Sequence, residues 1–166
     1  MNRSSLPFPF VCSLALLLLV VSSAASVESR WVGAWMSSQQ LCEDKNRPPA
    51  PGFAGATLRQ VVRLSLGGAC LRIHISNAFG DAPLTVDSAQ VAVSLGDGAI
   101  CPESSRAVLF HGRPVITIPP GALAVSDPVD LPVVAQADLA VTFHLPAVPA
   151  AITSHPGSRT TSYLRP

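Results

Sequence analysis

The sequence predicts an all-β fold, an antiparallel β-sandwich of the jelly-roll kind with about eight or nine strands, preceded by a signal peptide. Short runs of alternating apolar and polar residues recur along the chain, with turn residues between them. The sixteen prolines of the sequence would interrupt most candidate helices. The connections are too short for parallel crossovers, which favours antiparallel pairing.

The first 26 residues have the composition of a secretory signal peptide. Arg3 supplies a positive charge, residues 8–21 are strongly apolar, and residues 22–26 (SSAAS) offer small side chains to a signal peptidase. The apolar run is shorter than the ~20 residues of a membrane-spanning helix, so an uncleaved anchor is the less favoured alternative. We expect cleavage after Ala25 or Ser26 and a secreted or periplasmic product that does not hold to the membrane.

The charge and cysteine content narrow the classes of partner. Removing Arg3 from the eleven Lys and Arg residues leaves ten, against ten Asp and Glu residues, so the processed chain is near neutral. Nucleic acid is therefore not an expected partner. Cys42, Cys70 and Cys101 remain, which permits at most one internal disulfide, and the spacing does not say which pair forms it. The cysteines lack histidines at ligand spacing, so we expect no metal site.

The first strands are expected on either side of a glycine pair. Residues 62–66 and 71–76 both alternate, and Gly67-Gly68 lies between them, which predicts a β-hairpin. Residues 54–62 are the one stretch that fits a short helical turn. Loops are expected at the Pro/Gly-rich residues 46–55 and at 146–156.

The remaining strands follow from the same alternation. They are expected at residues 84–86, 89–95, 107–110, 115–118 and 138–145. The run 138–145 is the clearest, because Leu139, Val141, Phe143 and Leu145 would share one face. Residues 27–148 are thus predicted to form the sandwich, and residues 149–166 a linker toward a further domain.

Several blocks, taken together and in order, resemble a known family. They are residues 31–38 (WVGAWMSS), 57–63 (TLRQVVR), 67–80 (GGACLRIHISNAFG), 117–121 (TIPPG), 126–129 (SDPV), 153–155 (TSH) and 161–164 (TSYL). They resemble the N-terminal region of secreted SGNH hydrolases, the GDSL-like lipase/acylhydrolase family. The resemblance implies a β-sandwich that precedes a flavodoxin-like α/β catalytic domain in the same polypeptide.

The resemblance also implies a reaction, the hydrolysis of acyl or carbohydrate esters by a serine nucleophile without a cofactor. The family's catalytic domain carries a Gly-Asp-Ser motif, an Asn and a Gly for the oxyanion, and a late Asp-x-x-His. None of these motifs occurs in the sequence, so we expect the chain alone to be inactive. Gly80-Asp81 and Gly96-Asp97 lack the serine and are typical of turns.

Six residues are candidates for contact with a substrate or with the catalytic domain. Trp31 and Trp35 would share a strand face and serve either packing or the stacking of a sugar. His74 lies on the polar side of its strand. His155, Arg159 and Tyr163 lie in or next to a polar loop, where the resemblance implies an inter-domain contact.

A catalytic triad built on Ser154 and His155 is disfavoured, since the side chains of adjacent residues diverge in an extended chain. Two other functions stay open. The chain is a free-standing extracellular carbohydrate-binding module, or a purely structural domain whose uncovered apolar face drives self-association.

Overall fold

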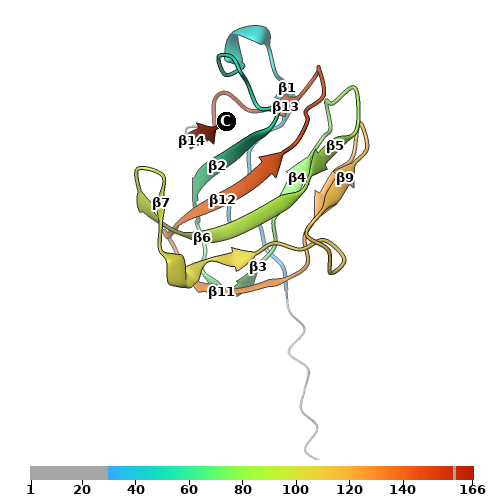
Figure 1. The fold of residues 1–166 in the computed structure, drawn as a ribbon. Helices are drawn as coiled ribbons and strands as arrows, with labels where there is room; N and C mark the ends of the chain where they lie inside the picture. Colours follow the sequence, from blue (N-terminus) through green and yellow to red (C-terminus); the bar gives the residue numbers. More distant parts are fainter. Residues whose placement is uncertain (1–29, 159) are drawn as a thin grey trace, which may run out of the picture. The chain divides into compact units, whose positions relative to one another are not determined.

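The computed structural model describes residues 30–158 and 160–166 (Figure 1). The expected signal peptide at 1–26 and the candidate Arg159 lie outside the described residues. Residues 32–166 form one unit. Its regular structure consists of strands and two short 3₁₀ helices, η1 (Asp44–Asn46) and η2 (Pro102–Ser104). No helix in this described part has the length and apolarity needed to cross a bilayer. The predicted all-β fold is confirmed.

One large antiparallel sheet forms the first layer of the sandwich. Its strands run in the order β14-β2-β12-β6-β7, and β8 also pairs with β6. They are β2 (Ala56–Arg63), β6 (Ser88–Gly96), β7 (Ala99–Ile100), β8 (Arg106–Ala107), β12 (Asp138–Leu145) and β14 (Thr161–Arg165). Figure 1 shows β2, β12 and β6 running side by side across the unit.

The second layer is assembled from three short antiparallel pairs. They are β3 (Gly68–Leu71) with β11 (Val129–Val133), β4 (His74–Ser76) with β10 (Leu123–Val125), and β5 (Leu84–Val86) with β9 (Ile116–Ile118). A backbone hydrogen bond from Ser126 to Ile73 joins the first two pairs. A separate small pair consists of β1 (Gln40–Leu41) and β13 (Thr153–Ser154).

The apolar core lies between the two layers. From the first layer it takes Leu139, Val141 and Leu145 of β12 with Ala89 and Val91 of β6, and from the second layer Val86, Val129 and Leu131. The inward face predicted for residues 138–145 is therefore confirmed. Leu95, which the alternation also places inward, is 67 % exposed, because the register shifts between Ser94 and Gly96 and ends the alternation.

The predicted hairpin at Gly67-Gly68 is wrong. β2 pairs with β12 and β14, whereas β3 pairs with β11 in the other layer. The chain therefore crosses between layers at this point. Gly67 is needed for the crossing, because a Cβ there would lie 2.6 Å from the backbone oxygen of Val133. The helical turn expected at 54–62 is also wrong, since β2 occupies most of that stretch.

The predicted linker at 149–166 needs a correction as well. Its residues form β13 and β14, and β14 pairs with β2 over five residues, from Thr161↔Val61 to Arg165↔Thr57. The sandwich therefore extends to Arg165. The strand was not expected because its sequence, TSYLR, is short and largely polar, as suits a strand at the edge of a sheet.

Candidate functional site

Asn77 has a structural role within the block that resembles the SGNH family. It is 1 % exposed, and its side-chain amide donates hydrogen bonds to the carbonyls of Ala82 (2.9 Å) and Ile118 (3.0 Å). Gly80 leaves the space for this amide, since a Cβ on Gly80 would lie 1.8 Å from Asn77 Oδ1. The pair therefore fastens the loop after β4 to the end of β9.

Ser126 and Asp127, in a later block, do the same for a neighbouring loop. The Ser126 hydroxyl accepts a hydrogen bond from the backbone N–H of Ile73 at 2.9 Å and donates to the carbonyl of Asp127 at 2.8 Å. The Asp127 carboxylate accepts from the backbone N–H groups of His111 (3.1 Å) and Gly112 (2.7 Å). These polar side chains are used to hold loops in place.

A groove of ≈ 560 Å³ lies on the outer face of the large sheet, the face turned away from the core. Its side chains come from several segments, and the ones that matter chemically are Trp35, Arg63, Asp97, Asp138, Thr161 and Tyr163. Arg63 and Asp138 are cross-strand partners on β2 and β12. Trp35 and Tyr163, two of the candidates nominated by the sequence, thus line one site. We call it the outer groove.

Trp35 is held at the outer groove by its neighbour in the chain. The carbonyl of Ala34 accepts hydrogen bonds from the backbone N–H (2.8 Å) and the hydroxyl (2.7 Å) of Ser65, just beyond the end of β2. The Trp35 side chain is 41 % exposed. Its ring therefore offers apolar surface to a ligand as well as to the protein.

Tyr163 is positioned by the tight turn between β6 and β7. Glycine is favoured at position 98 for two reasons. A Cβ there would lie 3.0 Å from the Tyr163 ring, and the φ of +75° is a conformation that residues with a side chain rarely adopt. Arg59 ties this turn to the sheet, because its guanidinium donates to the Gly98 carbonyl and, at 2.8 Å, to Thr142 Oγ1. The turn fixes the tyrosine ring at one side of the outer groove.

Arg63 and Asp138 form a bidentate ion pair at the outer groove. Arg63 Nε lies 2.8 Å from Asp138 Oδ1, and Nη2 lies 2.7 Å from Oδ2. The hydrogen bond from Arg63 holds the pKa of Asp138 below its ordinary value, and the same bond raises the pKa of Arg63. The side chains are 64 % and 37 % exposed, so the pair faces solvent and is free to contact a ligand.

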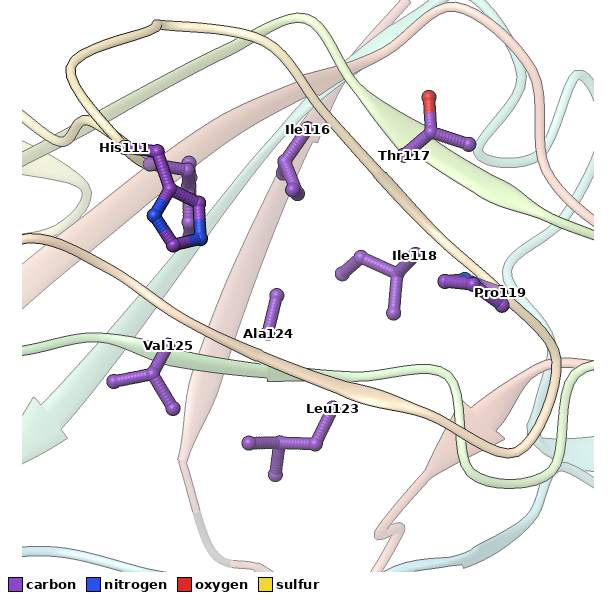
Figure 2. Close-up of a pocket in the computed structure, with 9 residues that line it drawn as sticks. His111, Ile116, Thr117, Ile118, Pro119, Leu123, Ala124 and Val125 are labelled. Atoms are coloured by element: carbon purple, nitrogen blue, oxygen red, sulfur yellow. The ribbon is translucent and has the colours of Figure 1, made fainter.

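A second, apolar groove lies between β9 and β10 in the opposite layer, with a volume of ≈ 310 Å³. Figure 2 shows its apolar side chains, among them Ile116, Ile118, Leu123 and Val125, with the His111 ring at one end. Among the described strands, β9 pairs with β5 and β10 with β4, so the two strands that flank the groove are not paired to each other.

Besides Arg63 and Asp138, the sequence analysis missed the polar pair His144 and Asp87. His144 Nδ1 lies 2.8 Å from Asp87 Oδ1, and Ser88 is the cross-strand partner of His144. Nothing in the sequence brings Asp87 and His144 together except the pairing of β6 with β12. None of the three lines either groove.

His74 and His155 are not among the described residues that line the outer groove. Trp31 is 43 % exposed and falls in the N-terminal stretch rather than in the sandwich unit. His74 is exposed at the start of β4 in the second layer. His155 Nδ1 and Ser154 Oγ are buried and have no hydrogen-bond partner among the described residues, so these two side chains do not form a catalytic pair.

The described residues include no cluster of three or more His, Cys, Asp or Glu side chains arranged to hold a metal ion. Cys42, Cys70 and Cys101 are free thiols. Comparison with known proteins finds neither a family that matches the chain nor a curated protein that resembles it.

Proposed function

We propose that the chain serves as the non-catalytic β-sandwich domain of a secreted SGNH-like ester hydrolase. In this proposal an α/β domain of the same polypeptide supplies the serine nucleophile, its histidine and the oxyanion donors. The reaction would be the hydrolysis of acyl or carbohydrate esters. The sandwich would support the catalytic domain or shape the access of substrate to it.

The structural use of the family-like blocks supports this proposal. Asn77, Gly80, Ser126 and Asp127 lie in those blocks, and all four are occupied in holding loops. Residues with this role stabilise the fold and do not take part in a reaction. A scaffold that carries a family's N-terminal blocks without its catalytic motifs fits an accessory domain.

The arrangement of the potential nucleophiles supports the proposal as well. A serine hydroxyl becomes a useful nucleophile only when a base takes its proton and nearby donors stabilise the oxyanion. His155 and Ser154 do not contact each other through a hydrogen bond. His144 and Asp87 form a pair, but on a part of the sheet that lines neither groove.

The test has two parts. The intact mass of the product secreted by the source cells should exceed that of residues 27–166 by a domain of roughly 150 to 200 residues. A fluorophosphonate probe, which labels activated serines, should react with that product within the added domain. A product with the mass of residues 27–166 would overturn the proposal.

The chain itself provides the second readout. Residues 27–166 expressed on their own should release no p-nitrophenol from p-nitrophenyl acetate above the rate with buffer, and should take up no probe. Ser88→Ala is the matched variant, because Ser88 is the serine across from the His144–Asp87 pair. Hydrolysis by the parent that Ser88→Ala abolishes would make the sandwich an enzyme in its own right and refute a non-catalytic role.

A further inference from the structure

The outer groove has the parts of a ligand site that the proposed accessory role does not require. It lies on the side of the large sheet away from the core, and the β6–β7 turn, Ser158 and Thr160 border it. Ser65 holds the backbone next to Trp35 through the Ala34 carbonyl, and the Tyr163 ring lies close to Gly98. Backbone contacts of this kind limit how far the groove must rearrange to bind a ligand.

The two aromatic rings give the outer groove its apolar contact surface. Trp35 is 41 % exposed, although a tryptophan that serves only packing would be mostly covered. Tyrosine and tryptophan combine a flat apolar face with one polar group, which suits ligands that have both kinds of surface. The ligand should therefore present an apolar face to the rings and polar groups at its edge.

The Arg63–Asp138 pair supplies the polar contacts. Two hydrogen bonds at 2.8 and 2.7 Å lock the guanidinium and the carboxylate in one plane. The guanidinium keeps further N–H donors, and the carboxylate oxygens keep further lone pairs. A hydroxyl group both donates and accepts hydrogen bonds. Neighbouring hydroxyls on a ligand can therefore accept from the Arg63 guanidinium and donate to the Asp138 carboxylate. The hydroxyl of Thr161 adds another donor and acceptor.

The charge of the outer groove selects among polar ligands. The described side chains that line it include one cation, Arg63, and two carboxylates, Asp97 and Asp138, which leaves one net negative charge. Among these described side chains the two carboxylates outnumber the one cation, which favours a neutral ligand over a phosphate or a carboxylate. A ligand with several hydroxyl groups is neutral and meets this condition.

From these features we infer that the outer groove binds a neutral carbohydrate, with a sugar ring against Trp35 or Tyr163 and its hydroxyls on the Arg63–Asp138 pair. The binding goes beyond the proposed accessory role and does not depend on it, because a free-standing sandwich would bind in the same way. An enzyme that acts on a carbohydrate ester would gain a second hold on its substrate.

The binding test uses a small panel of defined oligosaccharides. The secreted chain would be titrated calorimetrically with cellohexaose, xylohexaose and mannohexaose, and with hexagalacturonate as the anionic counterpart of similar size. At least one neutral hexamer should bind, and hexagalacturonate should bind more weakly than that hexamer. Absence of binding to all neutral hexamers at millimolar concentration would overturn the inference, as would a preference for hexagalacturonate.

Variants then assign the binding to the outer groove. Trp35→Ala should weaken binding by at least about tenfold, equivalent to ~1.4 kcal/mol, and Trp35→Phe should retain most of it because an aromatic face remains. Phe79→Ala is the matched control, because Phe79 is a similarly exposed aromatic residue (43 %) that does not line the outer groove, and it should bind as the parent does. Undiminished binding by Trp35→Ala would refute this location.

Three further measurements separate a loss of binding from a loss of folding and test the contact with Trp35. Far-UV circular dichroism would establish that each variant is folded, and Asp138→Asn, a nearly isosteric change, should also weaken binding because it removes the fixed ion pair. In Trp31→Phe, Trp35 is the sole tryptophan, so its fluorescence should change as the neutral hexamer is added. An unchanged emission at saturation would contradict contact with Trp35.

Discussion

Replacement of Asn77 by alanine should unfold the protein at much lower denaturant concentration. The side-chain amide donates to the carbonyls of Ala82 and Ile118, and the residue is 1 % exposed, so water cannot easily replace it. Each buried polar group that loses its partner costs ~1–3 kcal/mol. Taking the lower half of that range for two carbonyls gives a loss of about 2–4 kcal/mol in the free energy of unfolding.

Urea unfolding followed by far-UV circular dichroism measures this loss. With a slope of about 2 kcal/mol per molar urea, the midpoint of Asn77→Ala should fall by about 1–2 M. Asn46→Ala is the matched control, because Asn46 is exposed and its amide contacts only the exposed Glu43. That change should cost less than about 0.5 kcal/mol. Equal midpoints for the two variants would refute the structural role of Asn77.

A double-mutant cycle with Gly80 makes the test sharper. Gly80→Ala alone should be destabilising, because its Cβ would overlap the Asn77 amide, 1.8 Å from Oδ1. In the Asn77→Ala background the amide is gone, so the same change should cost much less. The loss of stability in the double mutant should therefore be smaller than the sum of the two single-mutant losses by about 1 kcal/mol or more. Strict additivity would show that the two residues do not share this space.

Three further changes have defined outcomes. Gly67→Ala should lower the free energy of unfolding by about 1–3 kcal/mol, because the added Cβ would clash with backbone atoms, which cannot move aside as a side chain can. Gly33→Ala is the control and should leave the free energy of unfolding unchanged, because no atom lies within 4 Å of the added Cβ. Urea midpoints of the two variants measure the difference. Val91→Ala, at a fully buried core position, should cost about 1–3 kcal/mol, and a loss below about 0.5 kcal/mol would contradict its place in the core. Because Arg63 lowers the pKa of Asp138 in the folded chain, the folded state binds fewer protons than the unfolded state. The ion pair therefore stabilises the folded state above the unfolded pKa of Asp, about 3.9, and this stabilisation is lost as the pH falls below that value. Asp138→Asn should lower the urea midpoint at neutral pH, and the midpoint of this variant should fall less than that of the parent as the pH is lowered toward 2. An equal fall of the midpoint in both proteins would count against a stabilising Arg63–Asp138 pair.

The alternation of side chains was a sound guide wherever a strand crosses the core. Residues 138–145 form β12, flanked by β2 and β6, and their period of two follows from burial on one face. The same rule failed beside Gly67, because pairing is decided by contacts distant in sequence. A glycine pair between two alternating runs is compatible both with a hairpin and with a crossing to the other sheet.

The outer groove shows a different limit of sequence analysis. Trp35 and Tyr163 were both nominated, but for separate reasons, and neither nomination implied that they line one site. Arg63 and Asp138 were not nominated, because an arginine and an aspartate far apart in the chain become a pair only through the register of β2 and β12. Such a site becomes visible only when the strand order is known.

The outer groove also connects the opposite ends of the sandwich unit. Trp35 lies near the beginning of the described chain and Tyr163 near its end, and both line the same hollow. Ends are where a folded chain frays first and where exopeptidases begin. When residues 27–166 are expressed on their own, a ligand that contacts both rings would hold the two ends of the unit together, and digestion by exopeptidases should slow as the site fills. Protection from proteolysis would then become a measure of occupancy that needs no label.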